Sequence, residues 1–301
     1  MLNSEIIKQK AREFGADLVG IGDITLFAGT TPQRDPLRIL PKAKCIIGCG
    51  FRVPRALYRA MDSQRQFFNY TQLGVKYIDE ELAEIFLLKM GGLIEDEGYD
   101  ACLQRNVSNL RIKGDHSTNP ELIDTYELVH AEPVAPGKPA PDIIIDFAQA
   151  AQICGLGAAG AAGNIIVPKF GPFVRFVFIV TDAPLETDPP FGQSLCDRCG
   201  ECVKACPGHA ISLENGVNTW QCAVYYRGAH RSNPFLPKDF LAGNPEREAI
   251  LDGTKVFDRE SARALYPELD FLPHRTGYAP CLCGKKCDVA CYNHLKEKNL
   301  L

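Results

Sequence analysis

The sequence predicts an α+β protein in two parts, a larger mixed domain followed by a smaller, cysteine-rich one. Segments with strand-like and helix-like apolar spacing alternate as far as Asp182. Nine of the 13 cysteines lie between Cys196 and Cys291. A chain of 301 residues is long enough for about two domains of ordinary size. We therefore expect the first part to build the main core. We expect the clustered cysteine thiols of the last third to have a functional role.

The composition is that of an ordinary globular protein, with 46% hydrophobic and 23% charged residues. The 33 Lys and Arg against 37 Asp and Glu leave a net charge of −4. This balance argues against a nucleic-acid partner, although it leaves room for a local basic patch.

The first 22 residues have scattered charges and no basic segment followed by an apolar stretch, so we predict no secretory signal. We expect the protein to lie in the reducing cytoplasm. In that compartment clustered cysteines are more often metal ligands or catalytic thiols than disulfides. The run 147–168 is uncharged and 22 residues long, close to the length of a membrane span. Its glycines and glutamines leave too little bulky apolar surface, so we predict no membrane span.

The first part of the chain reads as strands and helices in mixed order. A helix is expected over 4–14, with Ser4 as its N-cap, Gly15 at its end, and Ile6 and Ile7 on its apolar face. Strands are expected over 17–22, 44–51 and 98–103. Between the last two, residues 78–91 have helical apolar spacing that includes Leu82, Ile85 and Phe86.

Further along, a proline-rich stretch at 131–141 precedes a helix expected over 142–154. Residues 173–180 form an apolar run that predicts a strand buried on both faces. The composition of 183–193 is that of a linker. We therefore predict two domains, 1–188 and 189–301.

The densest motif is the cysteine run at 196–207, with the spacing Cys-x2-Cys-x2-Cys-x3-Cys-Pro. This spacing ligates [4Fe-4S] clusters, because three thiolates on one tight loop can reach three irons of the same cubane. The fourth thiol, Cys206, then belongs to a second cluster. A zinc site would need four ligands in tetrahedral pairs and would leave the triple spacing unexplained.

Two cubanes need eight thiolates, and the chain supplies nine cysteines from Cys196 onward, one more than that. Our preferred first set has four members: Cys196, Cys199, Cys202 and Cys291. The second set has Cys206, Cys222 and Cys287, together with either Cys283 or Cys281. Spacing to the cysteines that follow favours Cys283. The four early cysteines are expected to pack as small buried hydrophobes.

The segment 155–163 contains the spacing Gly155-x-Gly157-x2-Gly160, which matches the dinucleotide fingerprint. A dinucleotide site needs a long helix directly after the glycines, whereas Asn164 and then Pro168 follow here. We therefore expect the glycines to allow a close approach of the backbone, either to a flat or bulky ligand or to another element of the fold.

Three stretches carry a resemblance to a known family: 8–22, 155–190, and the cysteine run onward to His209-Ala-Ile-Ser212. Together they resemble the superfamily of epoxyqueuosine reductases and reductive dehalogenases. The resemblance implies that 1–188 is a nitroreductase-like α/β domain that binds base-off cobalamin. It implies that 189–301 is a ferredoxin-like domain with two [4Fe-4S] clusters and an insertion at 223–280. Electrons would pass through the clusters to cobalt and drive a reductive cleavage.

The same resemblance implies functional residues in the first domain. The acidic proton donor of the family falls near Asp142, with Asp146 as the other candidate, although we prefer an ordinary helix-start carboxylate for Asp142. The residues expected to contact the cofactor are Gly155, Gly157, Gly160, Asn164 and Arg175. For Arg175 a buried ion pair is an equal alternative. The chain departs from the family pattern at Ala161-Ala162, where a Lys or Arg is expected.

The expected function is that of a cytoplasmic iron–sulfur oxidoreductase that passes electrons through two clusters to a corrinoid. It would perform a reductive cleavage or a corrinoid reduction. A redox partner of the ferredoxin or flavodoxin type would supply the electrons, and a small molecule or a corrinoid protein would accept them. The alternative is an electron-transfer or docking protein with no organic cofactor, or with FMN. The insertion, with short capped helices expected over 244–253 and 258–266, is long enough to cover a site.

Overall fold

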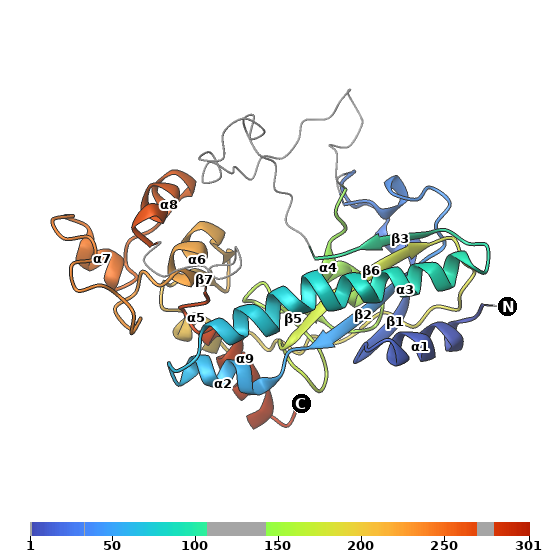
Figure 1. Cartoon of the computed structure of the whole chain (residues 1–301), viewed down its shortest axis with the longest axis horizontal. Coiled ribbons are helices and arrows are strands. Elements are labelled where there is room, and N and C mark those ends of the chain that lie inside the picture. The colour runs from blue at the N-terminus through green and yellow to red at the C-terminus, as the bar shows by residue number, and fades with distance from the viewer. Residues whose placement is uncertain (1, 33, 107–142, 270–279) are drawn as a thin grey trace. The chain divides into compact units, whose positions relative to one another are not determined.

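The structure, a computed structural model, describes residues 2–32, 34–106, 143–269 and 280–301 (Figure 1). Its contacts divide the chain into two units, each assembled from separate stretches of sequence. The first unit comprises Met1–Gly50, Ala83–Leu156 and Phe176–Gly192; the second comprises Phe51–Leu82, Gly157–Arg175 and Gln193–Leu301. From Gln193 onward every described residue therefore lies in the second unit. The division of the chain into domains 1–188 and 189–301 stays a prediction.

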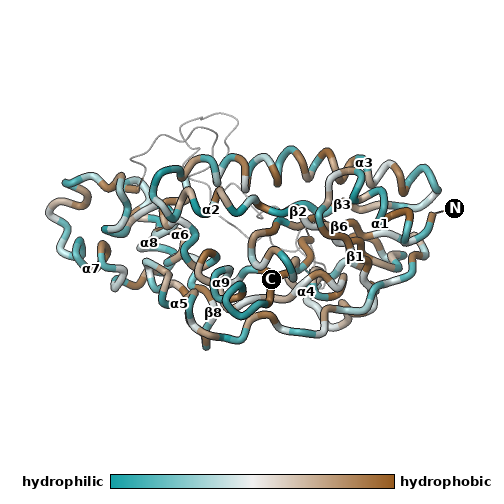
Figure 2. Tube along the Cα trace, turned by 90° about the horizontal axis from the view of Figure 1, so that it is seen from below, coloured by the Kyte–Doolittle hydropathy of each residue, from teal (hydrophilic) through white to brown (hydrophobic). Residues whose placement is uncertain are grey.

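A four-stranded sheet with the order β1-β2-β6-β3 forms the core of the first unit. Its strands are β1 (Leu18–Asp23), β2 (Cys45–Arg52), β3 (Ala101–Gln104) and β6 (Val174–Thr181). β1 pairs antiparallel with β2, and β3 pairs antiparallel with β6. Nearly every residue of β2 and β6 is buried, and Figure 2 shows apolar residues gathered on β1 and β6. The four strands predicted from apolar runs are thus confirmed.

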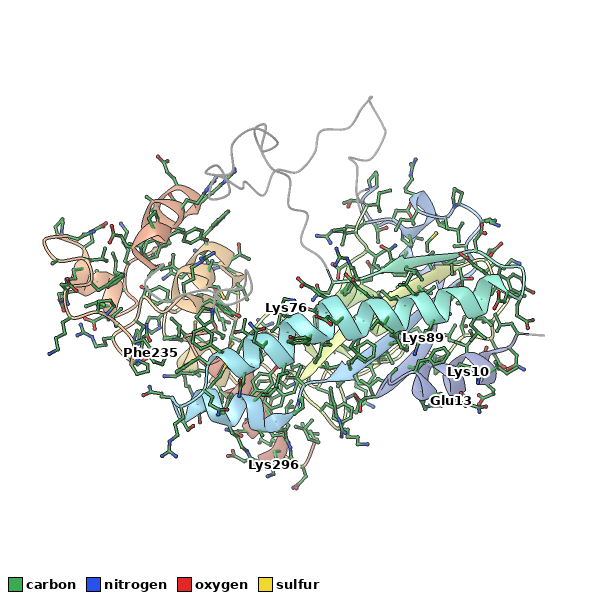
Figure 3. All side chains as sticks on the ribbon, in the orientation of Figure 1. Lys10, Glu13, Lys76, Lys89, Phe235 and Lys296 are labelled. Carbon is green, nitrogen blue, oxygen red and sulfur yellow. The ribbon has the colours of Figure 1, made fainter. Side chains whose placement is uncertain are left out.

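Helix α1 (Ser4–Glu13) begins the first unit and packs on β1. Its N-cap is Asn3, whose side chain accepts from the N–H of Ile6 at 2.9 Å, so the prediction of Ser4 as the cap was wrong. The Ser4 hydroxyl instead donates to the carbonyl of Glu186 at 2.8 Å. Ile6 is 36% exposed and lies off the buried face. On the outer side of α1, Lys10 and Glu13 form an ion pair at 2.7 Å (Figure 3).

The helix predicted over 78–91 is part of a longer helical segment. It begins as a π-helix, η3 (Tyr70–Leu82), and continues as α3 (Ala83–Glu95). Leu82 and Ile85 are 40% and 54% exposed, whereas Phe86 is buried, so the predicted apolar face is wrong at the first two residues and confirmed at the third. A π-helix has more residues per turn than an α-helix, and spacing counted at 3.6 residues per turn therefore loses its phase across the junction. Besides Phe86, the residues that α3 buries include Leu87, Met90 and Ile94.

Two 3-10 turns, η1 (Ile24–Phe27) and η2 (Pro36–Arg38), follow β1 in the first unit. Helix α4 (Phe147–Ile153) completes this unit. It begins five residues later than predicted, because residues 143–146 have no regular secondary structure and Asp146 caps the helix.

The second unit consists of short helices and three hairpin-sized pieces of β-structure. Besides η3, its helices are α2 (Arg55–Asp62), α5 (Glu201–Ala205), α6 (Thr219–Tyr226), α7 (Arg247–Leu251), α8 (Arg259–Leu265), η5 (Tyr266–Leu269) and α9 (Lys286–Glu297). Its strand pairs are β4 (Ala158–Ala159) with β5 (Ile165–Ile166), and β7 (Ile211–Ser212) with β8 (Gly216–Val217). A single bridge joins Val167 and Gly171.

Residues 224–269, which lie in the described part of the predicted insertion, contain an apolar core of their own. Tyr225 of α6 packs there with Ile250 of α7 and Leu265 of α8, and the Tyr225 hydroxyl donates to the Ile250 carbonyl at 2.8 Å. Both predicted helices are present, and α8 has a capping box between Asp258 and Ser261. In the described ranges no helix combines the length and apolar character that crossing a membrane requires.

Candidate metal centre

Four thiols of the second unit face one cavity. Cys196 and Cys199 come from the irregular loop before α5, Cys202 from the first turn of α5, and Cys291 from α9. The loop can turn tightly because Gly200 has φ 80°, a left-handed conformation that favours glycine. α5 and α9 pack directly against each other, which brings Cys291 to the loop from 89 or more residues away in sequence. These four are the first set predicted from spacing.

Burial affects the protonation of these thiols. It raises the pKa of Cys202, and it raises the pKa of Cys291 to about 12, with further contributions from the charges of neighbouring groups, including the other thiols. Gathering four thiolates in one small cavity is therefore unfavourable without a compensating cation. Iron supplies that positive charge and deprotonates the thiols that bind it. The donor set is thus chemically suited to a [4Fe-4S] cluster.

A second group of thiols includes Cys206, the C-cap of α5. Cys206 directly follows α5, Cys222 is on α6, Cys283 lies before α9 and Cys287 is in the first turn of α9. The pKa of Cys222 is raised to about 11, first by burial and then by charges that include those of Cys283 and Cys206. The pKa of Cys287 is also raised, first by burial and then by charges that include Cys283 and Cys206. The four thiols therefore share one environment.

Cys281 and Cys283 differ in their surroundings. Cys281 is fully buried, and its backbone N–H donates to the Thr71 hydroxyl at 3.2 Å. Its sulfur lies 3.7 Å from that of Cys283, and this hydrogen bond is the largest cause of the raised pKa of Cys283. Cys283 is in turn the thiol whose charge raises the pKa of both Cys222 and Cys287. This arrangement favours Cys283 as the ligand and Cys281 as its neighbour; the choice stays a prediction.

Sequence reasoning missed a buried polar group between the two sets. Asp288 is 4% exposed, accepts from the Asn164 amide at 2.9 Å, and pairs with the Lys285 ammonium at 3.3 Å. The charge of Asp288 is the main reason that the pKa of Lys285 is raised. A signal for this group was available, because a Lys and an Asp stand inside the closely spaced cysteines 283–291. The group ties the β4–β5 hairpin to the start of α9.

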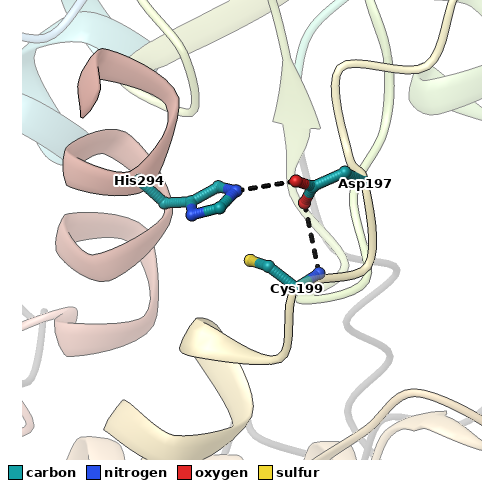
Figure 4. A group of neighbouring side chains, drawn as sticks. All are labelled: Asp197, Cys199 and His294. Atoms are coloured by element: carbon teal, nitrogen blue, oxygen red, sulfur yellow. Dashed lines mark hydrogen bonds and ion pairs between the residues drawn. The ribbon is translucent and has the colours of Figure 1, made fainter. Parts of the chain in front are cut away.

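A second missed contact holds the cysteine loop to α9 (Figure 4). The His294 Nε2 lies 2.8 Å from Asp197 Oδ2, and the Cys199 N–H donates to Asp197 Oδ1 at 3.2 Å. The hydrogen bond from His294 is the main cause of a lowered pKa for Asp197. One possible ligand atom from each of Asp197, Cys199 and His294 lies within 4.8 Å of the others. Since Cys199 belongs to the first set, we interpret the contact between Asp197 and His294 as one that holds the cysteine loop in place against α9.

The glycine segment forms the β4–β5 hairpin, and no helix follows it. A Cβ on Gly157 would lie 2.4 Å from the Ile166 carbonyl oxygen, and one on Gly160 would lie 2.4 Å from the Asn164 side-chain oxygen. The hairpin strands are therefore close because these positions have no side chain. Packing within the chain is a sufficient reason for glycine at positions 157 and 160. A contact with a cofactor stays a prediction for these two glycines, for Gly155 and for Asn164.

The remaining predicted residues have structural partners or lie outside the described ranges. Arg175 pairs with Asp79 through two contacts, one of them from Nε to Oδ1 at 3.0 Å. Burial opposes the charged form of Arg175, but the hydrogen bonds and charge of Asp79 outweigh it, and the pKa of Arg175 is raised. Asp146 accepts from the N–H groups of Ala148 and Gln149 as the cap of α4. Asp142 lies outside the described residues.

Comparison with known proteins identifies the cysteine loop. Residues 189–212 match the family model described as a 4Fe-4S binding domain. The chain is 36% identical over 92 residues to the epoxyqueuosine reductase of Synechococcus sp. strain CC9605, covering 31% of this chain and 28% of that protein. It is 38% identical over 96 residues to the tetrachloroethene reductive dehalogenase of Dehalobacter restrictus, covering 30% and 16%.

Over these stretches the chain is similar to epoxyqueuosine reductases and reductive dehalogenases. The resemblance found in the sequence is thus confirmed. The matches span less than a third of the length of either relative. A solved catabolic reductive dehalogenase in complex with 3-bromo-4-hydroxybenzoic acid has a similar fold, with a TM-score of 0.51 and 15% identity, over 98% of this chain and 36% of that one.

Proposed function

We propose that this chain is an iron–sulfur oxidoreductase that passes electrons through two [4Fe-4S] clusters to a corrinoid. The observation that carries the proposal is the arrangement of eight thiols in two groups of four. Cys196, Cys199, Cys202 and Cys291 would hold one cluster, and Cys206, Cys222, Cys283 and Cys287 the other. Bound clusters supply one-electron transfer. The match to a 4Fe-4S binding domain supports the first of these sites.

Two helices connect the proposed cluster sites. α5 has Cys202 in its first turn and Cys206 directly after its end. α9 has Cys287 and Cys291 one helical turn apart, a separation of about 6 Å along the helix. Each helix therefore gives one thiol to each site. This connection supports rapid electron passage between the two sites, because they are held close together by rigid backbone.

The corrinoid part of the proposal rests on the family resemblance. Relatives are named as tetrachloroethene reductive dehalogenases and epoxyqueuosine reductases. In this chain Ala161 and Ala162 line the cavity of the first thiol set, where the family pattern has a cation. The substrate chemistry of this chain would then differ from that of the relatives, because no cation at these positions would stabilise a leaving group.

The alternative is an electron-transfer or docking protein without an organic cofactor, or with FMN. The relatives do not favour it, since their names are those of reductases and dehalogenases. In either case a redox partner of the ferredoxin or flavodoxin type would supply electrons. The acceptor would be a small molecule or a corrinoid protein. The argument from net charge against a nucleic-acid partner stays a prediction.

The test begins with anaerobic purification of the full chain. We expect about eight irons and eight acid-labile sulfides per chain, and fewer than about seven irons would contradict the two-cluster proposal. Addition of cob(II)alamin should shift its visible spectrum. A spectrum unchanged by the protein would contradict the corrinoid part and leave the cluster part standing. Extraction of a flavin from the purified protein would favour the FMN alternative.

A further inference from the structure

A second cavity of the second unit has a cationic lining and lies apart from the two thiol sets. It has a volume of about 680 Å³, within the range typical of small-molecule sites. Four cations that line it are Arg55 and Arg59 of α2, Lys169 of the turn after β5, and Lys296 of α9. Arg52 lines it as well. Among the described residues that line it, none has an acidic side chain.

The position of these cations is set by packed elements. Arg55 and Arg59 are four residues apart on α2, and therefore lie on the same side of that helix. The Arg55 guanidinium donates to the Tyr292 hydroxyl at 3.2 Å, which orients it against α9. Lys296, one turn beyond Tyr292 on α9, is exposed (Figure 3). The cations thus converge from three separate segments.

The floor of the cavity is apolar and rigid. Phe173 is 3% exposed and stacks between two tyrosines, with ring centroids 3.7 Å from Tyr58 and 4.5 Å from Tyr292. Phe170 also lines the cavity, and the Lys169 ammonium lies 5.3 Å from the centroid of its ring. A ligand can therefore place a flat or apolar portion against this floor and its charge against the rim.

Like charges gathered in a concave surface repel one another and attract an anion strongly. The guanidinium groups of arginine and the ammonium groups of lysine are the usual partners of phosphate oxygens. The N-terminus of α2 adds to the positive potential of the cavity. Residues of its first turn line the cavity, and no side chain caps its backbone N–H groups. We propose that this cavity binds a phosphorylated small molecule of the size and charge of a nucleoside triphosphate. Its phosphates contact Arg55, Arg59, Lys169 and Lys296, and its organic part packs on Phe170 and Phe173.

The test is a binding titration of the full chain, purified anaerobically, with the fluorescent nucleotide mant-ATP. It is done at about 150 mM salt, so that attraction to scattered surface charge is largely screened. We expect saturable binding that ATP and inorganic triphosphate reverse and that adenosine does not. The Arg55→Gln/Arg59→Gln double variant should bind at least about tenfold more weakly, because it loses two charge-assisted contacts. Lys296→Gln, at an exposed side chain, should weaken binding about threefold or more.

The matched control is Arg65→Gln/Lys298→Gln, which removes two exposed cations near the same helices but outside the cavity lining. It should change the affinity by less than about twofold. The iron content of each variant reports whether it is folded, and it is independent of nucleotide binding. No saturable binding by the unaltered chain up to about 1 mM mant-ATP would overturn the proposal. An equal loss in the control variant, or binding of nucleic acid alone, would overturn it too.

Discussion

Cys287 and Cys291 lie one turn apart on α9, yet they face different groups of thiols. Cys291 lines the cavity of Cys196, Cys199 and Cys202, while the charges of Cys206 and Cys283 raise the pKa of Cys287. Since an α-helix is rigid over one turn, a displacement of α9 would move a ligand of both proposed clusters together.

Cys291→Ser should remove one proposed cluster and leave the other. We expect the iron content to fall from about eight to about four per chain, because a serine hydroxyl is a poor substitute for a thiolate ligand. Iron and sulfide analysis of anaerobically purified protein measures this. Cys102→Ser, at a half-buried thiol of the sheet, is the control and should keep the full content. Unchanged iron in Cys291→Ser would contradict the assignment.

Cys283→Ser and Cys281→Ser should behave differently. We expect Cys283→Ser to lose about half of the iron, since its thiol shares the environment of Cys222 and Cys287. Cys281→Ser should keep its iron, because this residue contacts Cys283 and Thr71 as a buried neighbour. The same iron and sulfide analysis, with the reduced electron paramagnetic resonance spectrum, separates the two. Loss of iron only in Cys281→Ser would reverse the choice.

Arg175→Met should lower the free energy of unfolding by about 3 to 5 kcal/mol, because it leaves the Asp79 carboxylate, 7% exposed, without its partner. The measurement is urea unfolding followed by circular dichroism. The double variant Asp79→Leu/Arg175→Met should recover much of the loss, since it removes the stranded charge. A loss below about 1 kcal/mol in the single variant would mean that the pair is not structural, and would revive the cofactor role of Arg175.

Cys45 should make the stability of the protein fall at alkaline pH. Burial raises the pKa of its thiol to about 11, and the thiol donates to the Ala183 carbonyl at 3.4 Å. The folded pKa lies above the unfolded value of about 8.5, so the contribution is complete below pH 8.5 and declines as the pH rises toward 11. By pH 10 the loss should be about 1 to 2 kcal/mol.

The check is urea unfolding of the wild type and of Cys45→Ala between about pH 7.5 and 10. Cys45→Ala leaves a small cavity that lowers stability by the same amount at every pH. The signature is therefore a shallower decline with pH in the variant than in the wild type. Parallel curves would show that Cys45 does not titrate differently in the two states.

Features that depend on near neighbours in the chain could be predicted from the sequence. The runs that became β2 and β6 are almost continuously apolar, which is typical of buried strands. The spacing within 196–206 predicts the cluster ligands, because three thiols separated by two residues each can bind the same cluster from one tight loop. The residues after Gly160 excluded a dinucleotide helix, and the structure has a hairpin there.

The tertiary structure decided whatever depends on residues far apart in the chain. Arg175 could equally have bound an anionic cofactor until its contact with Asp79, 96 residues away, was known. Asp288 had no predicted role, because its partner Asn164 is 124 residues away. Cys281 and Cys283 are two residues apart, and only their different burial and neighbours distinguish them. The sequence by itself thus determined which residues could bind iron, since ligand spacing is a local property. Spacing also predicted how they group, whereas only the fold shows the packing of α5 against α9 that brings Cys291 to the loop, since contacts between distant segments depend on tertiary packing.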